Sequence, residues 1–457
     1  MNFKSALVIS LLVFALCAPL ASAKVSEEAA ERLGEDLTPL GAEVAGEGDV
    51  PPWTGGLTGV PKGIKFDPKT EHPPNPYPDD KIKYTITRQN MAAYDALLTD
   101  GHKAMLKRVP GFKLNVYQSR RSCTVPKFVQ EATKDAARNT ELTKDGEGVV
   151  GVTVGTPFPF PGSGKELMWN HKLRYLPHKM VRDVVSAQVD PSGAYKLVHY
   201  DDRVLNRLAG SAELLARGPN ISVLFKRTVI WPTVFADIAD ADFLMHETIN
   251  GAIEPRKVWA YSPGTRRVRR GPNFSYDGPS FENSALFTAD SFDGFNGALD
   301  RYDWAIVRRS VKIVPYNSYL IVNSKSDELI GPKYLAPGFV RYEPHRVWMV
   351  EARLRPGQRH IYERRVLHLD EDTYTVLSAE NYDSRGKLWR TQEIHTINFY
   401  QAPVCLPIAQ LVYDLRGWKG YAVGSLTNEE RRVDVDASDK LQESGFTPES
   451  IRAIVER

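Results

Sequence analysis

The 457-residue sequence lacks the motifs that most often identify an enzyme. It contains no Gly-x-Ser-x-Gly turn and no His-Glu-x-x-His pair, which mark serine hydrolases and zinc proteases. It has three cysteines and no Cys-x-x-Cys pair, so neither thiol exchange nor a zinc ribbon is indicated. Its histidines are scattered, and a turn between strands explains the carboxylates at 370–372. We therefore expect no enzymatic activity, no metal site and no other cofactor.

A strong excess of charge is also absent. Lys and Arg number 59 and Asp and Glu 56, which gives a net charge of +3 and argues against bulk nucleic-acid binding. Hydrophobic residues make up 42% of the chain and aromatic residues 10%, with eight tryptophans. This composition suits either a large β core or an apolar binding cavity.

Long hydrophobic runs are missing after the first residues. Lys4 precedes the apolar stretch 6–17, and Ala21-Ser22-Ala23 has the pattern of a cleavage site, which together predict a signal peptide. The stretch is shorter than the roughly 20 apolar residues that span a bilayer. Lipid attachment at Cys17 is disfavoured because Leu16 stands where a small residue is needed. We predict cleavage after Ala23 and a mature chain in the periplasm.

Removal of the signal peptide leaves two cysteines, Cys123 and Cys405. In an oxidising compartment an even pair favours a disulfide, and the alternative is two buried thiols. A bridge between them would close a loop of about 280 residues, for which the chain-entropy estimate is roughly 5 kcal/mol.

Composition divides the chain into four segments. They are the signal peptide at 1–23, an N-terminal arm with helices at 24–160, an antiparallel sheet domain at 161–424, and a C-terminal tail with a helix at 425–457. Prolines between 51 and 78 exclude regular helix and central strand, so this part is either an extended arm or a linker. Apolar spacing and capping residues predict helices near 26–33, at 91–105, after Pro126, and from Ser163 with Glu166 as a capping box.

Alternating apolar residues and turn signals predict successive strands from Met180 to Gly424. They are expected at 181–189 with 194–200, 221–231, 243–249 with 257–261, 305–314 with 319–322, and as a meander of 347–354, 359–369, 374–381 and 388–399. The expected fold is α+β, with one curved antiparallel sheet forming a half-barrel and helices packed on or over its open face. Both faces of strand 388–399 mix polar and apolar residues, which a sheet holding an amphipathic ligand could tolerate.

The segment 258–270 predicts a hairpin with a basic tip. Val258 to Tyr261 favours a strand, Pro263-Gly264 favours a turn, and four arginines follow within five residues. They are Arg266, Arg267, Arg269 and Arg270. Two interpretations remain open: a solvated face that protects an edge strand, or a surface that binds anionic groups.

Several motifs resemble one family. LTPLGAEV at 37–44, PWTGGL at 52–57, Phe158 to Pro161 with Trp169-Asn170-His171, segment 258–270 and YDSRGKLW at 382–389 resemble the domain of unknown function 1329 family of exported Gram-negative proteins. The resemblance spans the mature chain. More distantly, the helix at 163–175, the sheet and the Tyr261-Ser262-Pro263-Gly264 turn resemble the outer-membrane lipoprotein-sorting (LolA/LolB-like) carrier superfamily, although the region before residue 160 is much longer here.

The resemblance implies a carrier that holds a lipid-like, hydrophobic or amphipathic molecule in a half-barrel cavity. It also implies work with a resistance-nodulation-division type exporter of the inner membrane or with an outer-membrane component. Aromatic residues are the candidates for the cavity wall: Trp169, Phe225, Trp231, Trp259, Tyr261, Trp304, Trp348 and Trp389. The four arginines are candidates for binding headgroups or a partner. The alternatives are an envelope adaptor without a ligand and, less favoured, an exported hydrolase that uses carboxylates.

Overall fold

The computed structural model describes residues 25–68, 70–210, 220–230, 241–251, 253–271, 276–278, 280, 284–428, 433–437 and 441–453. The predicted signal peptide at 1–23 and Trp231 lie outside these residues. Within the described ranges no helix has both the length and the apolar character needed to cross a membrane.

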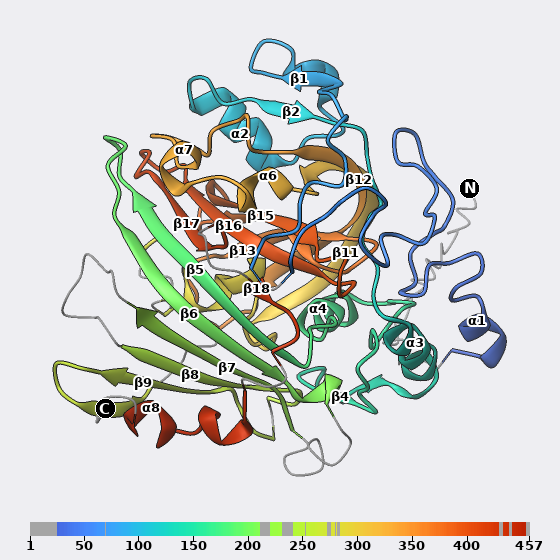
Figure 1. Ribbon diagram of the computed structural model, residues 1–457, viewed down its shortest axis with the longest axis vertical. Coiled ribbons are helices and arrows are strands. Elements are labelled where there is room, and N and C mark those ends of the chain that lie inside the picture. Colours follow the sequence, from blue (N-terminus) through green and yellow to red (C-terminus); the bar gives the residue numbers. More distant parts are fainter. Residues whose placement is uncertain are drawn as a thin grey trace, which may run out of the picture.

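The fold is α+β and is built on a sixteen-stranded sheet, in which all neighbours are antiparallel except β2 and β12 (Figure 1). The main path runs β1 (Tyr84–Ile86), β2 (Leu114–Val116), β12 (Tyr342–Leu354), β13 (Arg364–Asp370), β14 (Val376–Tyr382), β15 (Leu388–Asn398), β16 (Cys405–Asp414), β17 (Tyr421–Leu426), β5 (Lys179–Val189), β6 (Leu197–Asn206), β7 (Ile221–Ile230), β8 (Asp242–Thr248), β9 (Lys257–Ser262) and β10 (Arg267–Arg270). β11 (Tyr302–Pro315) pairs with β12, and β18 (Val433–Asp434) pairs with β5. A separate hairpin joins β3 (Glu141–Leu142) to β4 (Val149–Val150).

Short helices lie around this sheet. They are α1 (Glu27–Glu31), η1 (Met91–Tyr94), α2 (Asp100–Arg108), α3 (Lys127–Asn139), α4 (Gly164–Lys172), η2 (Arg207–Ala209), η4 (Ala289–Gly294), α6 (Tyr319–Val322), α7 (Ser326–Leu329), η5 (Glu443–Phe446) and α8 (Ser450–Ala453). Figure 1 shows α2, α6 and α7 near β1 and β2, whereas α8 lies beside β8 and β9.

Turn chemistry fixes the hairpins that the sequence predicts. Between β5 and β6, Asp190 Oδ1 accepts the backbone N–H of Ser192 at 2.8 Å, and Gly193 takes a φ of 93°, which favours glycine. The β7–β8 and β8–β9 pairs and the meander from β12 to β15 follow the same antiparallel pattern. Three pairings join strands that are far apart in sequence: β2 with β12, β18 with β5, and β17 with β5. The last of these joins the strands that follow the meander to the first hairpin.

Two predictions of local structure are wrong. Tyr319–Val322, expected as a strand beside β11, is helix α6, because Pro315 ends β11 and Asn317 turns the chain with a φ of 50°. The hydroxyl of Tyr319 then donates to the carbonyl of Asn398 at 2.8 Å, which holds α6 on the sheet. The single helix expected over 91–105 is divided into η1 and α2, and Thr99 caps α2 by accepting the N–H of His102 at 3.1 Å.

The region before residue 160 is attached to the sheet rather than separate from it. Its strands β1 and β2 extend the sheet beyond β12. Among the described residues of 51–83 there is neither helix nor strand. This stretch is held by hydrogen bonds such as Leu57 N–H to the Ser122 carbonyl at 2.8 Å and the Tyr400 hydroxyl to the Pro74 carbonyl at 2.9 Å.

A disulfide joins Cys123, which precedes α3, to Cys405 at the start of β16. Their Cα atoms lie 5.7 Å apart, although 282 positions separate the two residues in sequence. The bond ties the N-terminal region covalently to the centre of the sheet.

Candidate binding pocket

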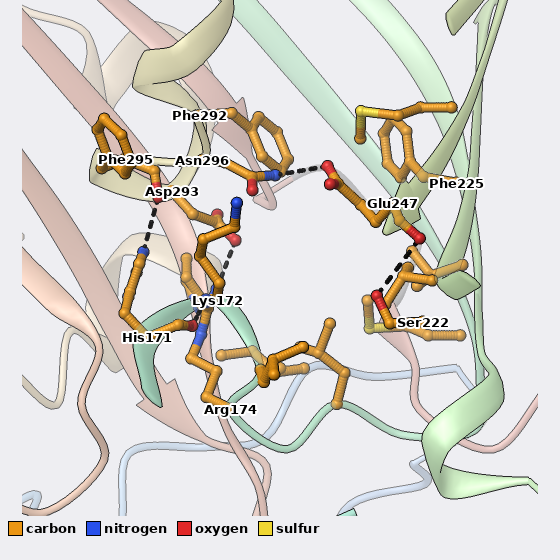
Figure 2. A pocket seen from close by; sticks show the side chains of 18 of the residues that line it. His171, Lys172, Arg174, Ser222, Phe225, Glu247, Phe292, Asp293, Phe295 and Asn296 are labelled. Carbon is orange, nitrogen blue, oxygen red and sulfur yellow. Dashed lines mark hydrogen bonds and ion pairs between the residues drawn. The ribbon is translucent and has the colours of Figure 1, made fainter. Parts of the chain in front are cut away.

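A pocket lies where α4 and the chain that follows it meet β5–β8, η4 and the first residues of β16 (Figure 2). The empty space between its walls, open mouth included, is about 790 Å³. Most of the wall is apolar: Trp169, Leu173, Leu176, Met180, Val204, Val223, Phe225, Met245, Phe292, Phe295, Leu406 and Pro407. The polar part of the wall consists of His171, Lys172, Arg174, Arg182, Ser222, Glu247, Thr248, Asp293 and Asn296.

Helix α4 is placed by its first turn, as the capping-box motif predicts. Ser163 Oγ accepts the N–H of Glu166 at 3.2 Å, and the Glu166 carboxylate accepts the N–H of Ser163 at 3.2 Å. Gly164 is required because a Cβ atom there would lie 2.7 Å from the backbone carbon of Trp304. This close contact fixes the start of α4 against β11, so that the residues of its last turn reach the pocket.

His171 connects α4 to η4 and to β14. The Val376 N–H lies 3.2 Å from His171 Nδ1, which is also 3.1 Å from the Tyr374 carbonyl, and Nε2–H donates to the Phe295 carbonyl at 3.0 Å. Burial, assisted by the charge of Arg174, lowers the pKa of His171 to about 3. The imidazole is therefore neutral at physiological pH and has a positioning role.

Lys172, the last residue of α4, extends towards Asn296 and Asp293 in Figure 2. Its Nζ donates to the Gly297 carbonyl at 2.7 Å and lies 4.9 Å from the centre of the Trp169 ring. Lys172 forms no ion pair with any carboxylate of the described chain. Burial lowers its pKa to about 8, so most of the side chains still carry the positive charge at neutral pH.

The guanidinium of Arg174 is bound on one side of the pocket. It forms an ion pair with Asp293 and donates to the His171 carbonyl at 2.7 Å. Burial alone would raise the pKa of Asp293, but the charges of Arg174 and Arg182 outweigh it and hold that pKa below its usual value. Gln410 of β16 also contacts Asp293, which fixes this carboxylate between two elements.

Glu247 of β8 is bound on the opposite side. Its carboxylate pairs with Arg256 at 2.7 Å and accepts the side-chain N–H of Asn296 at 3.1 Å. Arg182 pairs with Asp202 at 3.0 Å. Each carboxylate of the pocket wall is thus paired with an arginine, an arrangement that suits charge balance better than general acid–base catalysis.

Two of the eight aromatic residues predicted for a cavity line this pocket. Trp169 and Phe225 belong to its wall, and Trp231 lies outside the described residues. Trp259 and Tyr261 pack with Leu244 against α8, whereas Met245 and Glu247 of β8 face the pocket, because successive side chains of a strand point to opposite faces.

The other three tryptophans have partners elsewhere. Trp304 donates to the Leu299 carbonyl at 2.9 Å, and its ring lies 5.0 Å from that of Phe295. Trp348 lies under the guanidinium of Arg309. Trp389 donates to Asp414 at 3.1 Å, and the Arg416 guanidinium lies 4.2 Å from its ring. A ligand-binding role for these three therefore stays a sequence-based prediction that the pocket does not support.

The four arginines of the hairpin lie at the edge of the sheet. β9 and β10 pair antiparallel, with Arg267 opposite Ser262 and Arg270 opposite Trp259, and β10 ends the strand order. Arg266 takes a φ of 50° in the turn. All four side chains are exposed and form no ion pair with the described residues. The hairpin is present as predicted, and its arginines are open to solvent.

Residues that the sequence did not single out complete the pocket. Lys172 and Arg174 follow Trp169 closely, but basic residues at a helix end are commonly placed there by the helix dipole. Met180, Met245, Glu247 and Asp293 come together only through the strand order and η4. No sequence signal could have placed these residues side by side.

His345, Asp370 and Asp372 form the one group of possible metal ligands found among the described residues, with ligand atoms within 4.8 Å of one another. Arg121 binds both carboxylate oxygens of Asp372, at 2.6 and 2.9 Å. Asp370 Oδ2 accepts from the Tyr316 hydroxyl at 3.0 Å, and Asp370 Oδ1 has no hydrogen-bond partner. Both oxygens of Asp372 are therefore engaged in holding the N-terminal region on the sheet through Arg121, and Asp370 Oδ2 is engaged by Tyr316.

The fold and the pocket define an α+β protein with a helix-walled pocket on a large antiparallel sheet. The model of the family "protein of unknown function (DUF1329)" matches residues 85–452. The uncharacterized protein PA3922 of Pseudomonas aeruginosa is 39% identical over 446 residues, which cover 96% of each chain. The chain belongs to the DUF1329 family, as its motifs predict.

Two solved structures resemble the chain at low sequence identity. A DUF1329 family protein from Desulfovibrio piger is 14% identical, covers 60% of this chain and 92% of its own, and has a TM-score of 0.40. The LolA superfamily protein NE2245 from Nitrosomonas europaea is 14% identical, covers 63% of this chain and 98% of its own, and has a TM-score of 0.35.

Proposed function

We propose that this protein is a periplasmic carrier that holds a hydrophobic or amphipathic, lipid-like molecule in the pocket beside α4. In this proposal the sheet curves into a half-barrel around the ligand. The protein passes the ligand to or from a resistance-nodulation-division type exporter or an outer-membrane component. The observation that carries the proposal is the pocket itself, with a mainly apolar wall and a few charged groups on α4, η4 and β8.

Burial of apolar surface can hold such a ligand without covalent chemistry. At about 25 cal/mol per Å², burying roughly 200 Å² of an acyl chain contributes about 5 kcal/mol, before the cost of immobilising the chain. The methionines Met180 and Met245 favour a ligand of variable shape, because their unbranched side chains adapt to irregular surfaces.

The arginine hairpin provides a second contact in the proposal. Four exposed guanidiniums at one sheet edge suit anionic headgroups or an acidic partner surface, which planar donors bind well. The hairpin adjoins β8, which contributes Met245 and Glu247 to the pocket wall. A membrane or partner bound there would lie next to the strands that hold the ligand.

The alternatives fit the pocket less well. A hydrolase that uses carboxylates needs an acid and a base free to exchange protons, and both Glu247 and Asp293 are held by arginines. An adaptor without a ligand would use the proline-rich stretch as its binding surface, but Leu57 and Pro74 already bond to this chain's own backbone and side chains.

The test is to purify the protein from its native host without detergent, extract it with organic solvent and identify small molecules by mass spectrometry. We expect a lipid-like compound in stoichiometric amount, and its loss when Phe292 is replaced by Trp to fill the pocket. Phe128→Trp, at an exposed position on α3, is the matched control. Repeated recovery of an empty protein that also binds no added fatty acid would reject the carrier.

A further inference from the structure

Lys172 differs from every other charged group in the pocket wall. Arg174 is paired with Asp293, Arg182 with Asp202, and Glu247 with Arg256. Lys172 has a single described hydrogen-bond partner, the carbonyl of Gly297, and no ion pair with a described residue. An ammonium group has three N–H donors, so two remain for a ligand.

The position of this ammonium joins the apolar and polar parts of the wall. Its Nζ lies 4.9 Å from the centre of the Trp169 ring, which attracts the cation and limits its movement. In Figure 2 the amino group points towards Asn296, across the pocket from Phe225. A ligand whose head met Lys172 would place its chain against the wall that Phe225, Met245 and Leu176 form.

From this arrangement we infer that the pocket, in its proposed carrier role, selects amphiphiles with a single carboxylate head, which pairs with Lys172. Glu247, Glu147 and Asp300 act on Lys172 without forming an ion pair with it, so one ammonium is left to pair with one negative charge. A phosphate monoester carries more charge, and no second uncompensated cation lines the described wall, since both guanidiniums already pair with carboxylates. The buried Nε–H of Arg174, which has no hydrogen-bond partner, is a further neighbouring donor.

The experiment measures the affinity of the purified, delipidated protein for dodecanoic acid, dodecanol and dodecyl phosphate by calorimetry at neutral pH. We expect dodecanoic acid to bind at least about tenfold more tightly than the other two, since a hydrogen bond to a charged group contributes roughly 1.5–3 kcal/mol. Lys172→Met should remove this preference and leave dodecanol binding unchanged. Lys172→Arg should retain it, because the charge remains.

The matched control is Lys165→Met. Lys165 lies on the same helix but pairs with Glu147 at 2.7 Å outside the pocket, so its loss should change none of the three affinities. Equal binding of acid and alcohol to the unaltered protein would overturn the inference and leave the carrier intact. Tighter binding of dodecyl phosphate, or an equal loss of acid and alcohol in Lys172→Met, would also overturn it. Binding of none of the three would reject the carrier itself.

Discussion

The two faces of strand β15 are covered by different helices, α2 on one and η4 on the other. The α2 region is closely packed, whereas the region beyond η4 contains the pocket. On one face, α2 packs so closely that a Cβ on Gly101 would lie 2.0 Å from Thr391 Oγ1. There His102 Nε2 meets Glu393 at 3.0 Å, and Glu393 also accepts from the Tyr342 hydroxyl. On the other face, η4 contacts Ile394, and beyond it lies the pocket beside α4.

The comparison shows that buried polar groups do not by themselves indicate a ligand. The mixed faces of strand 388–399 suggested an amphipathic ligand, yet no residue of β15, which is described throughout, belongs to the wall of the pocket beside α4. The polar residues Glu393 and His395 are bound by His102 and Ser318 of this chain. The pocket lies elsewhere, between the last residues of α4 and the strands β5–β8.

The largest expected effect on stability concerns the disulfide that joins Cys123, between β2 and α3, to β16. Replacing Cys123 and Cys405 with Ser should lower the free energy of unfolding by up to about 5 kcal/mol, because a loop of 282 positions is released. Urea unfolding of the variant and of the unaltered protein, each with and without reductant, measures the effect. Reductant should act only on the unaltered protein, and an unchanged midpoint there would contradict the prediction.

The next effect is a pH dependence of the free energy of unfolding, which arises only on the side of the sheet that α2 covers. Burial raises the pKa of Glu380, which accepts the Gly101 N–H, to about 7 from 4.5. Between these values the folded state holds a proton that the unfolded state releases, so stability falls as pH rises from about 4.5 to 7, by about 3 kcal/mol. Glu380→Gln should remove this loss and be more stable than the unaltered protein at pH 8.

The measurement is urea unfolding at about pH 4, 6 and 8. The difference in free energy of unfolding between Glu380→Gln and the unaltered protein should be small near pH 4 and should grow as the pH rises. Glu363→Gln, at an exposed position, is the matched control and should show no such trend. A constant difference across the series would show that the pKa of Glu380 is the same in the folded and unfolded states, and would contradict the prediction.

A smaller effect distinguishes the two regions directly. Thr99 caps α2 and Ser163 caps α4, and each helix has nine residues. Replacing either residue with Ala should cost about 1 kcal/mol of stability. Only Ser163→Ala should also weaken dodecanoic acid binding, because α4 carries Lys172. Equal loss of affinity in both variants would mean that the pocket depends on global stability rather than on α4.

The smallest effect on stability belongs to the arginine hairpin. Replacing Arg266, Arg267, Arg269 and Arg270 with Gln should change the free energy of unfolding by less than about 0.5 kcal/mol, because these side chains are exposed. Sedimentation with vesicles that contain anionic lipid should show loss of binding. Replacing the exposed Arg385 and Lys387 in the β14–β15 turn serves as the control. Unchanged vesicle binding would mean that the arginines form a solvated face that protects the edge strand and do not bind anionic lipid.

Much of the local structure could be predicted because its signals lie within a few residues. The turn at Asp190, the capping box from Ser163 to Glu166 and the hairpin at 258–270 all form where the sequence indicates. Tyr319–Val322 could not be predicted in this way, because four apolar residues, three of them aromatic or β-branched, fit a strand as well as a buried helix. The contact with Asn398 decides between the two.

The pocket could be predicted only in part, because it is a product of strand order. Trp169 and Phe225 were found by their aromatic character, but Trp304 and Trp389 share that character and pack against other partners. Lys172 could not be distinguished from other helix-end cations until the ion pairs of its neighbours were known.

The pairing of β5 with β17 sets the order in which the molecule can be completed. Residues 179–189 must wait for residues 421–426, more than two hundred positions later, before this contact forms. Contacts so distant in sequence form slowly, because a long loop must close before they contribute. The pocket wall takes residues from both sides of the β5–β17 pairing: Met180 and Met245 from the β5 side and Leu406 from the β17 side. A growing chain therefore has no pocket until nearly its whole length is available, and in the proposed carrier role a ligand would be loaded only onto a finished molecule.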